Sequence, residues 1–139
     1  MKIKTERILI DTLGGVQVID ITSQVHQLLA RSNLTEGLAT VFVPGSTAAV
    51  TTIEFEPGLV ADITKALDRI APRDGHYEHD QRWHDGNGHS HVRASFLKPS
   101  VTIPFSNKAL MLGTWQQLVF IELDVRPRNR TIVVQLIGD

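Results

Sequence analysis

Histidine is concentrated in one short part of this chain. Five of the six histidines lie within sixteen residues, together with Asp80, Asp85 and Asn87: His76, His79, His84, His89 and His91. The chain has no cysteine, so a transition metal would have to be bound by imidazole and carboxylate groups. The segment therefore predicts a divalent metal site, for zinc or magnesium, with His79, His89 and His91 as ligands.

The spacing of His89 and His91 links the chemistry to the backbone. In an extended segment the two side chains leave the same face and could bind one ion. In a helix they would point about 200° apart and could not. We therefore expect an extended backbone here, with His79 and His91 as functional residues. His76 and His84 fit a solvated loop, and His26 fits a structural position in a helix.

A second polar series lies between residues 46 and 54. Ser46, Thr47, Thr51, Thr52 and Glu54 are interspersed with apolar residues in what is predicted to be a buried hairpin. Buried polar groups are costly unless they are paired, so the series predicts a lined cavity, although short hydroxyl side chains are also common in strands. We single out Glu54 because packing does not explain a carboxylate inside a sheet.

A third cluster combines GTWQQ, residues 113–117, with the basic run RPRNR, residues 126–130. Arg126, Arg128 and Arg130 could bind phosphate through their forked guanidinium groups, with help from the Gly113 amide and the Thr114 hydroxyl. The alternative is a solvated basic turn, which is the commoner role of such a run.

The elements that must position these residues follow from periodicity and turn signals. Strands are predicted at residues 2–11 and 16–21, forming a hairpin around Gly14 and Gly15. A helix beginning at Thr22 or Ser23 has Val25, Leu28 and Leu29 on its apolar face. Residues 38–44 and 48–55 predict a second hairpin, and Pro57 opens a helix that runs to residue 70.

Residues 73–88 contain almost no aliphatic side chains, so we expect them to run over the surface. Three strands follow, at residues 100–105, 114–124 and 131–137. The 139 residues thus predict a single α+β domain over 1–139, with mainly antiparallel sheets and two main helices.

Composition limits the classes of partner. The formal net charge of −1 gives no global field toward nucleic acid or an anionic lipid surface. The N-terminal residues lack an apolar signal core, and no apolar run reaches membrane-spanning length. We expect a cytoplasmic protein that binds neither nucleic acid nor membrane.

Five ordered motifs resemble the YjbQ-like family, which is linked to a secondary thiamine phosphate synthase activity. They are PGSTAAVTTIE, DGNGHSHVRASFL, PS-x-T-I-P, LGTWQ and FIELDVRPRNRTIVVQLIG. The resemblance implies an α+β homotrimer with pockets near subunit boundaries. It implies catalytic roles for His79, His91 and Glu54, and it matches the family's other persistent positions at Ser95, Gly113, Thr114, Trp115 and Gln116.

The implied reaction joins hydroxymethylpyrimidine diphosphate to thiazole phosphate and releases pyrophosphate. In that scheme His79 and His91 would hold a metal or the diphosphate, and Arg128 or Arg130 would bind a phosphate, with Ser46 and Thr47 in the ligand pocket. Two alternatives remain open: a non-catalytic trimer that binds a metal or a small phosphorylated ligand, and a metal-dependent phosphohydrolase.

The chain departs from the family pattern at two positions. Many relatives have histidine followed by two threonines where this chain has Gly45, Ser46 and Thr47, so one potential ligand is missing. Many relatives also have glycine at the position of Lys98. The first difference weakens the expectation of a fixed metal site.

Overall fold

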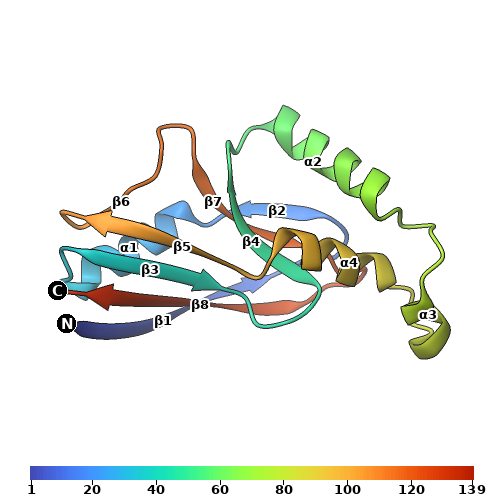
Figure 1. The fold of residues 1–139 in the computed structure, drawn as a ribbon, viewed down its shortest axis with the longest axis horizontal. Helices are drawn as coiled ribbons and strands as arrows, with labels where there is room; N and C mark the ends of the chain where they lie inside the picture. The colour runs from blue at the N-terminus through green and yellow to red at the C-terminus, as the bar shows by residue number, and fades with distance from the viewer.

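The computed structural model describes all residues from Met1 to Asp139. The chain forms eight strands and four helices. The two chain ends lie side by side (Figure 1), and the amino group of Met1 pairs with Asp139. The elements in chain order are β1 (Lys2–Asp11), β2 (Gln17–Asp20), α1 (Thr22–Ser32), β3 (Gly37–Phe42), β4 (Ala48–Ile53), α2 (Pro57–Ile70), α3 (Glu78–Trp83), α4 (Gly88–Leu97), β5 (Ser100–Ser106), β6 (Ala109–Leu110), β7 (Gln117–Glu122) and β8 (Asn129–Gly138).

The strands form two sheets in which every pairing is antiparallel. One sheet has the order β1-β8-β3-β5-β6 and the other has the order β2-β7-β4. The predicted α+β class with antiparallel sheets is confirmed. The expectation of two main helices was too low, because α3 and α4 are also helical.

Both predicted hairpins are wrong. β1 pairs with β8 and β2 with β7, while β3 pairs with β5 and β8 and β4 with β7. The two turns therefore carry the chain from one sheet to the other. Gly14 has φ +88°, and a Cβ added there would lie 2.6 Å from the backbone carbon of Arg126, so this crossing requires glycine. Turn residues show where the chain reverses, but they do not specify the strand it pairs with.

Two apolar clusters hold the layers together. The larger has 18 buried residues and joins α1 to both sheets, with Leu29, Phe105 and Phe120 among its largest side chains. Val25, Leu28 and Leu29 of α1 are buried as predicted. The smaller cluster has 6 buried residues, including Leu67 of α2 and Ala94 of α4 packed against β7. At about 25 cal/mol per Å² of apolar surface, these clusters dominate the stability of the fold.

The helices differ in how well their sequences predict them. α2 spans Pro57–Ile70 as predicted, with proline in its first turn and Glu56 accepting hydrogen bonds from Gly58 N and Leu59 N. α3 has no buried residue, in agreement with the surface position expected for this segment. No helix is both long and apolar enough to cross a membrane.

The helix α4 was not predicted, and it overturns the extended backbone expected at His89 and His91. Its buried residues are Gly88, His89, Ser90, Arg93 and Ala94. A helix that buries a largely polar face lacks the apolar periodicity by which helices are recognised.

Candidate functional site

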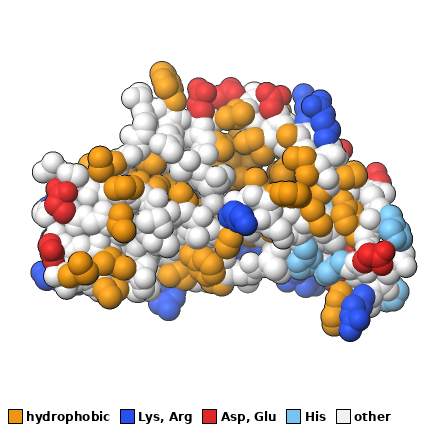
Figure 2. Space-filling model, viewed as in Figure 1, with side chains coloured by type: hydrophobic (Ala, Val, Ile, Leu, Met, Phe, Trp, Pro, Cys, Tyr) orange, Lys and Arg blue, Asp and Glu red, His pale blue; other side chains and the backbone are white.

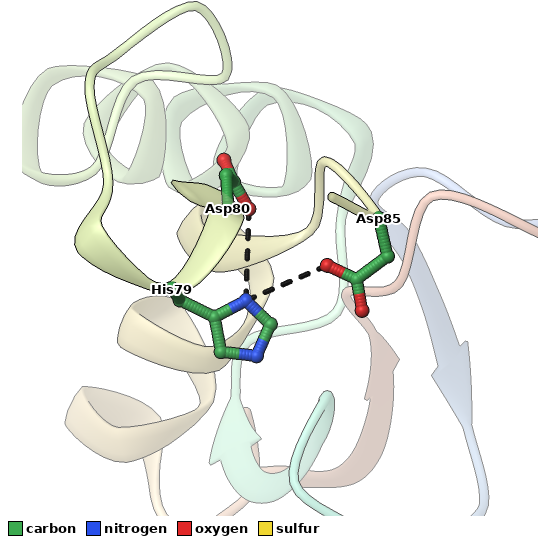
Figure 3. Close-up of side chains that lie close together, drawn as sticks. All are labelled: His79, Asp80 and Asp85. Carbon is green, nitrogen blue, oxygen red and sulfur yellow. Dashed lines mark ion pairs between the residues drawn. The ribbon is translucent and has the colours of Figure 1, made fainter. Parts of the chain in front are cut away.

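Three side chains around α3 point toward one another (Figure 3). The Nδ1 atom of His79 lies 3.6 Å from Asp80 Oδ1 and 3.5 Å from Asp85 Oδ1. It is buried and has no hydrogen-bond partner. These separations are too long for hydrogen bonds. Two ligands bound about 2.1 Å from one tetrahedral ion lie roughly 3.4 Å apart, so the geometry suits a divalent cation between them.

His91 completes this group from α4. Its ring centroid lies 4.4 Å from that of His79, so the two histidines expected to act together do meet. We name His79, Asp80, Asp85 and His91 the histidine cluster. The histidines gather at the end of the molecule formed by α3 and α4 (Figure 2).

His89 does not belong to the histidine cluster, and the expectation that it shares a face with His91 is wrong. Two residues apart on a helix, the rings leave in different directions. His89 is buried and faces the Tyr77 ring, whose centroid lies 6.2 Å away. Asp80 and Asp85 lie beside His79, where we had expected His89. In the sequence we had noted them only as neighbours of the histidines.

The pKa values of His89 and His91 both lie below the ordinary histidine value. For His89, burial is the largest cause, followed by the positive charges of Arg93 and Arg73. For His91, burial is again the largest cause, followed by the charge of His79. Both rings are therefore neutral at neutral pH, which is the form in which imidazole binds metal ions.

The loop before α4 fixes the cluster. Asp80 Oδ1 accepts a hydrogen bond of 2.8 Å from Gly88 N, which ties α3 to the start of α4. The Asn87 amide lies between two carboxylates. It donates to Asp124 Oδ1 at 3.3 Å or, with the amide rotated by 180°, to Asp85 Oδ1 at 3.0 Å. Asn87 therefore lies between the cluster and the end of β7 and bonds to one of them in each orientation.

Two buried carboxylates that the sequence analysis missed lie at this end of β7. Glu122 and Asp124 have no exposed surface. Glu122 accepts from Arg130 Nη2 at 2.5 Å, from Arg130 Nε at 2.8 Å and from Thr12 Oγ1 at 2.7 Å. Asp124 Oδ2 accepts from Arg128 Nε at 2.8 Å and forms an ion pair with Arg128 Nη2 at 2.6 Å. The sequence does contain a pattern that could have predicted these ion pairs: the acidic residues 122 and 124 at the end of an apolar strand, followed by the basic residues 128 and 130.

Thr47 joins the two ion pairs. Its hydroxyl accepts from Arg130 Nη2 at 2.9 Å and donates to Asp124 Oδ2 at 3.1 Å. We name Thr12, Thr47, Glu122, Asp124, Arg128 and Arg130 the carboxylate network. Burial is the largest single influence and would raise the pKa of Glu122 and of Asp124. The arginine hydrogen bond, the other hydrogen bonds and the arginine charge together outweigh it, so both pKa values lie below the ordinary range.

These pairings change the interpretation of the basic run. Arg128 and Arg130 were expected to bind phosphate, but each is already neutralised by a buried carboxylate. An exposed Arg126 borders a cavity of about 130 Å³ together with Asp85, Asn87 and Asp124. Arg126 is the one of the three arginines that has no ion pair, and it lies beside Asp85 of the histidine cluster.

Other predicted ligand residues lie elsewhere. Ser46 and Ser95 are exposed and border a separate cavity of about 180 Å³. β4 ends at Ile53, so Glu54 is exposed beyond the strand and its expected place inside a sheet is wrong.

The GTWQ motif is at the same end of β4 as Glu54. Gln116 Nε2 donates to Thr52 Oγ1 at 3.0 Å, and Gln116 Oε1 accepts from Gly113 N at 3.0 Å. Thr114 and Trp115 are exposed in the β6–β7 loop, which Figure 1 shows at a distance from α3. Within one chain, this motif does not meet the histidine cluster.

Comparisons with known proteins give a consistent result. The sequence model of the family described as "UPF0047 protein YjbQ-like" matches residues 6–139. A UPF0047 protein of Methanothermobacter thermautotrophicus is 40% identical over 99% of this chain and 94% of its own length. The UPF0047 protein YugU of Bacillus subtilis is 33% identical over 93% of this chain and 96% of its own length.

Solved structures agree over almost the whole chain. A protein of unknown function from Sulfolobus solfataricus superposes with a TM-score of 0.94 at 32% identity, covering 99% of both chains. An uncharacterised protein from Clostridium acetobutylicum has a TM-score of 0.87 at 37% identity, covering 95% of this chain and 99% of its own.

Proposed function

Because the chain belongs to the YjbQ-like UPF0047 family, we propose that it is a secondary thiamine phosphate synthase of modest activity that works with a divalent cation. The reaction breaks the C–O bond between the pyrimidine methylene and the diphosphate and forms a C–N bond to the thiazole nitrogen. The products are thiamine phosphate and pyrophosphate. Such a transfer needs positioning and neutralisation of the leaving group more than covalent help from the protein.

The observation that carries the proposal is the unpartnered His79 Nδ1 atom facing two carboxylates at 3.5 and 3.6 Å. A histidine and two carboxylates form a donor set that suits zinc in the absence of thiolates, and carboxylates also suit magnesium. A divalent cation held there would neutralise charge on a departing diphosphate. The donor set therefore fits the cation that the proposal requires.

The remaining groups have roles that follow from their position. His91, neutral and next to His79, can donate one hydrogen bond to a phosphate oxygen. Arg126 borders the small cavity beside Asp85 and offers a cationic group without an ion pair. The carboxylate network fixes the wall of that cavity through Asp124.

We also propose that the chain acts as a homotrimer. Several large apolar side chains are exposed, among them Trp115 at 72%, Phe96 at 65% and Met111 at 64%, and exposed apolar surface favours a protein interface. A neighbouring copy could bring its Glu54 and GTWQ motif to the histidine cluster, which these residues do not reach within one chain. Light scattering that gives a monomer mass over a wide dilution range would refute the trimer.

The activity test compares wild type with His91→Ala and with His76→Ala, an exposed histidine outside the cluster. We measure thiamine phosphate formation and binding of the pyrimidine diphosphate with added zinc or magnesium. His91→Ala should lose at least about tenfold in rate or affinity, roughly 1.4 kcal/mol. His76→Ala should match wild type.

Two results count against the transferase. Binding of the diphosphate without product formation would favour a non-catalytic binding trimer. Release of inorganic phosphate from the diphosphate without coupling to the thiazole would favour a hydrolase. Equal behaviour of His91→Ala and wild type would remove the histidine cluster from the chemistry.

A further inference from the structure

The largest cavity of the molecule is not the one beside the histidine cluster. It measures about 440 Å³ and lies between the β1–β2 connection, α2, α4 and the end of β7. This volume is within the range of small-molecule sites. Its walls combine apolar side chains from Leu13, Val16, Leu123 and Val125 with polar groups from Thr64, Arg73, His89, Arg93 and Asp124.

Arg93 is a buried cation with incomplete pairing. Its side chain is 6% exposed. Its Nε donates to the Ala71 carbonyl at 2.9 Å and its Nη2 donates to Asp68 Oδ1 at 3.3 Å. Asp68 is 65% exposed, and Nη1 of Arg93 has no acceptor in the chain. Arg93 lines the cavity and therefore keeps N–H groups that a ligand there could bind.

His89 provides a second, independent sign of a missing partner. The residue is 4% exposed, it lines the cavity, and its Nδ1 atom has no hydrogen-bond partner. Buried polar atoms are rarely left unpaired. Arg73 adds an exposed guanidinium at the mouth of the same cavity.

The charge balance of this cavity favours an anion. Asp124 is its one wall carboxylate, and Arg128 neutralises it through a hydrogen bond of 2.8 Å from Nε and an ion pair of 2.6 Å from Nη2. Arg73 therefore has no ion pair, and Arg93 keeps unused N–H groups beside its pair with Asp68. The donors come from two elements, α4 and the segment after α2. Several donors suit the three terminal oxygens of a phosphomonoester better than a planar carboxylate, which a single guanidinium can bind edge-on.

We propose that the cavity between α2, α4 and the β1–β2 connection binds a small phosphomonoester with an apolar body, with Arg73, Arg93 and His89 as the phosphate-binding residues. The apolar wall accommodates the organic group. This site is separate from the histidine cluster and does not depend on the transferase proposal or on a bound cation.

The test uses calorimetric titration of the full-length protein in the presence of EDTA, with phenyl phosphate and inorganic phosphate as probes. Phenyl phosphate should bind at least about threefold more tightly than inorganic phosphate, because its ring buries apolar surface. Arg73→Gln should weaken binding of phenyl phosphate at least about tenfold. Arg73 is exposed, so this variant should fold even if a change at Arg93 does not.

Two controls define the site. Arg69→Gln removes an exposed arginine of α2 that does not border the cavity and should leave the affinity unchanged. Asp85→Asn disables the histidine cluster and should also leave it unchanged, whatever its effect on thiamine phosphate formation. The proposal is overturned if no binding occurs up to about 10 mM, if Arg73→Gln binds like wild type, or if binding requires a divalent metal.

Discussion

The carboxylate network and the histidine cluster lie on either side of Asn87, yet their charged groups differ in how completely they are paired. In the network, Glu122 and Asp124 each have an arginine partner and further hydrogen bonds. In the cluster, His79 Nδ1 faces two carboxylates without bonding to either. A completed set of partners indicates a structural role, whereas an incomplete set indicates a place for a ligand.

The first prediction tests the structural role of the carboxylate network by removing one of its charges. Glu122→Gln keeps the shape of the side chain but leaves Arg130, whose side chain is 10% exposed, without its counter-charge. Loss of one partner of a buried ion pair costs about 3–5 kcal/mol. We expect that loss of unfolding free energy in urea at pH 7, and we expect Glu54→Gln, at an exposed carboxylate, to change it by less than about 0.5 kcal/mol.

The pH dependence of the same pair of proteins checks the cause. The pKa of Glu122 is lowered in the folded state, so its stabilising effect is present above the unfolded value of about 4.3 and is lost as the pH falls through the folded value. The stability difference between wild type and Glu122→Gln should therefore shrink below about pH 4. A difference that stayed constant down to pH 2 would mean that packing, not charge, is responsible.

The sequence predicted the elements of this fold better than their connections. The apolar periodicity of residues 57–70 was sufficient for α2, since that helix packs an apolar face. α4 was missed because its buried face includes His89, Ser90 and Arg93. The two hairpins were wrong because strand pairing depends on distant residues that local turn signals do not report.

The sequence likewise indicated some residues of the candidate site but not the contacts between them. Residue types and spacing indicated His79, His89 and His91, because imidazole is the main transition-metal ligand left to a chain without cysteine. Of these, His79 and His91 lie together, and His89 packs against Tyr77 instead. The partners of Glu122 could not be predicted in the same way. They are Thr12 and Arg130, from opposite ends of the chain, and only the pairing of β1, β7 and β8 with their neighbours brings them together.

The second prediction tests whether the histidine cluster is open to a metal. Zinc at about a hundred times its dissociation constant should stabilise wild type by roughly 2.7 kcal/mol, and by about 1.4 kcal/mol if Asp85→Asn weakens binding tenfold. His76→Ala should retain the full effect. The stabilisation should disappear in acid because protonated imidazole does not coordinate.

Thermal unfolding with and without zinc measures this effect, and elemental analysis gives the stoichiometry. Asp85 is exposed, so Asp85→Asn without metal should differ from wild type by no more than about 0.5 kcal/mol. Equal zinc stabilisation in wild type and Asp85→Asn would show that the three atoms around His79 are not a metal site, and the contrast with the carboxylate network would no longer hold.

The smallest expected effect on the free energy of unfolding comes from the backbone conformation of Lys98, at the end of the helix that carries His91. Lys98 is the C-cap of α4, the helix that carries His91, and has φ +75° and ψ 153°. This backbone conformation is nearly restricted to glycine and costs other residues about 1–3 kcal/mol. Its N–H donates to Ala94 O at 2.9 Å and its carbonyl accepts from Val50 N at 3.2 Å, so α4 and β4 hold it in this conformation.

Lys98→Gly relieves the strain but adds about 1 kcal/mol of unfolded-state entropy. We expect a net gain of roughly 1 kcal/mol in the free energy of unfolding. Lys65→Gly, in the exposed middle of α2, is the matched control and should lose about 1 kcal/mol. Urea denaturation of both variants measures the difference, and a loss of stability in Lys98→Gly equal to that in Lys65→Gly would show that no strain is stored at the end of α4.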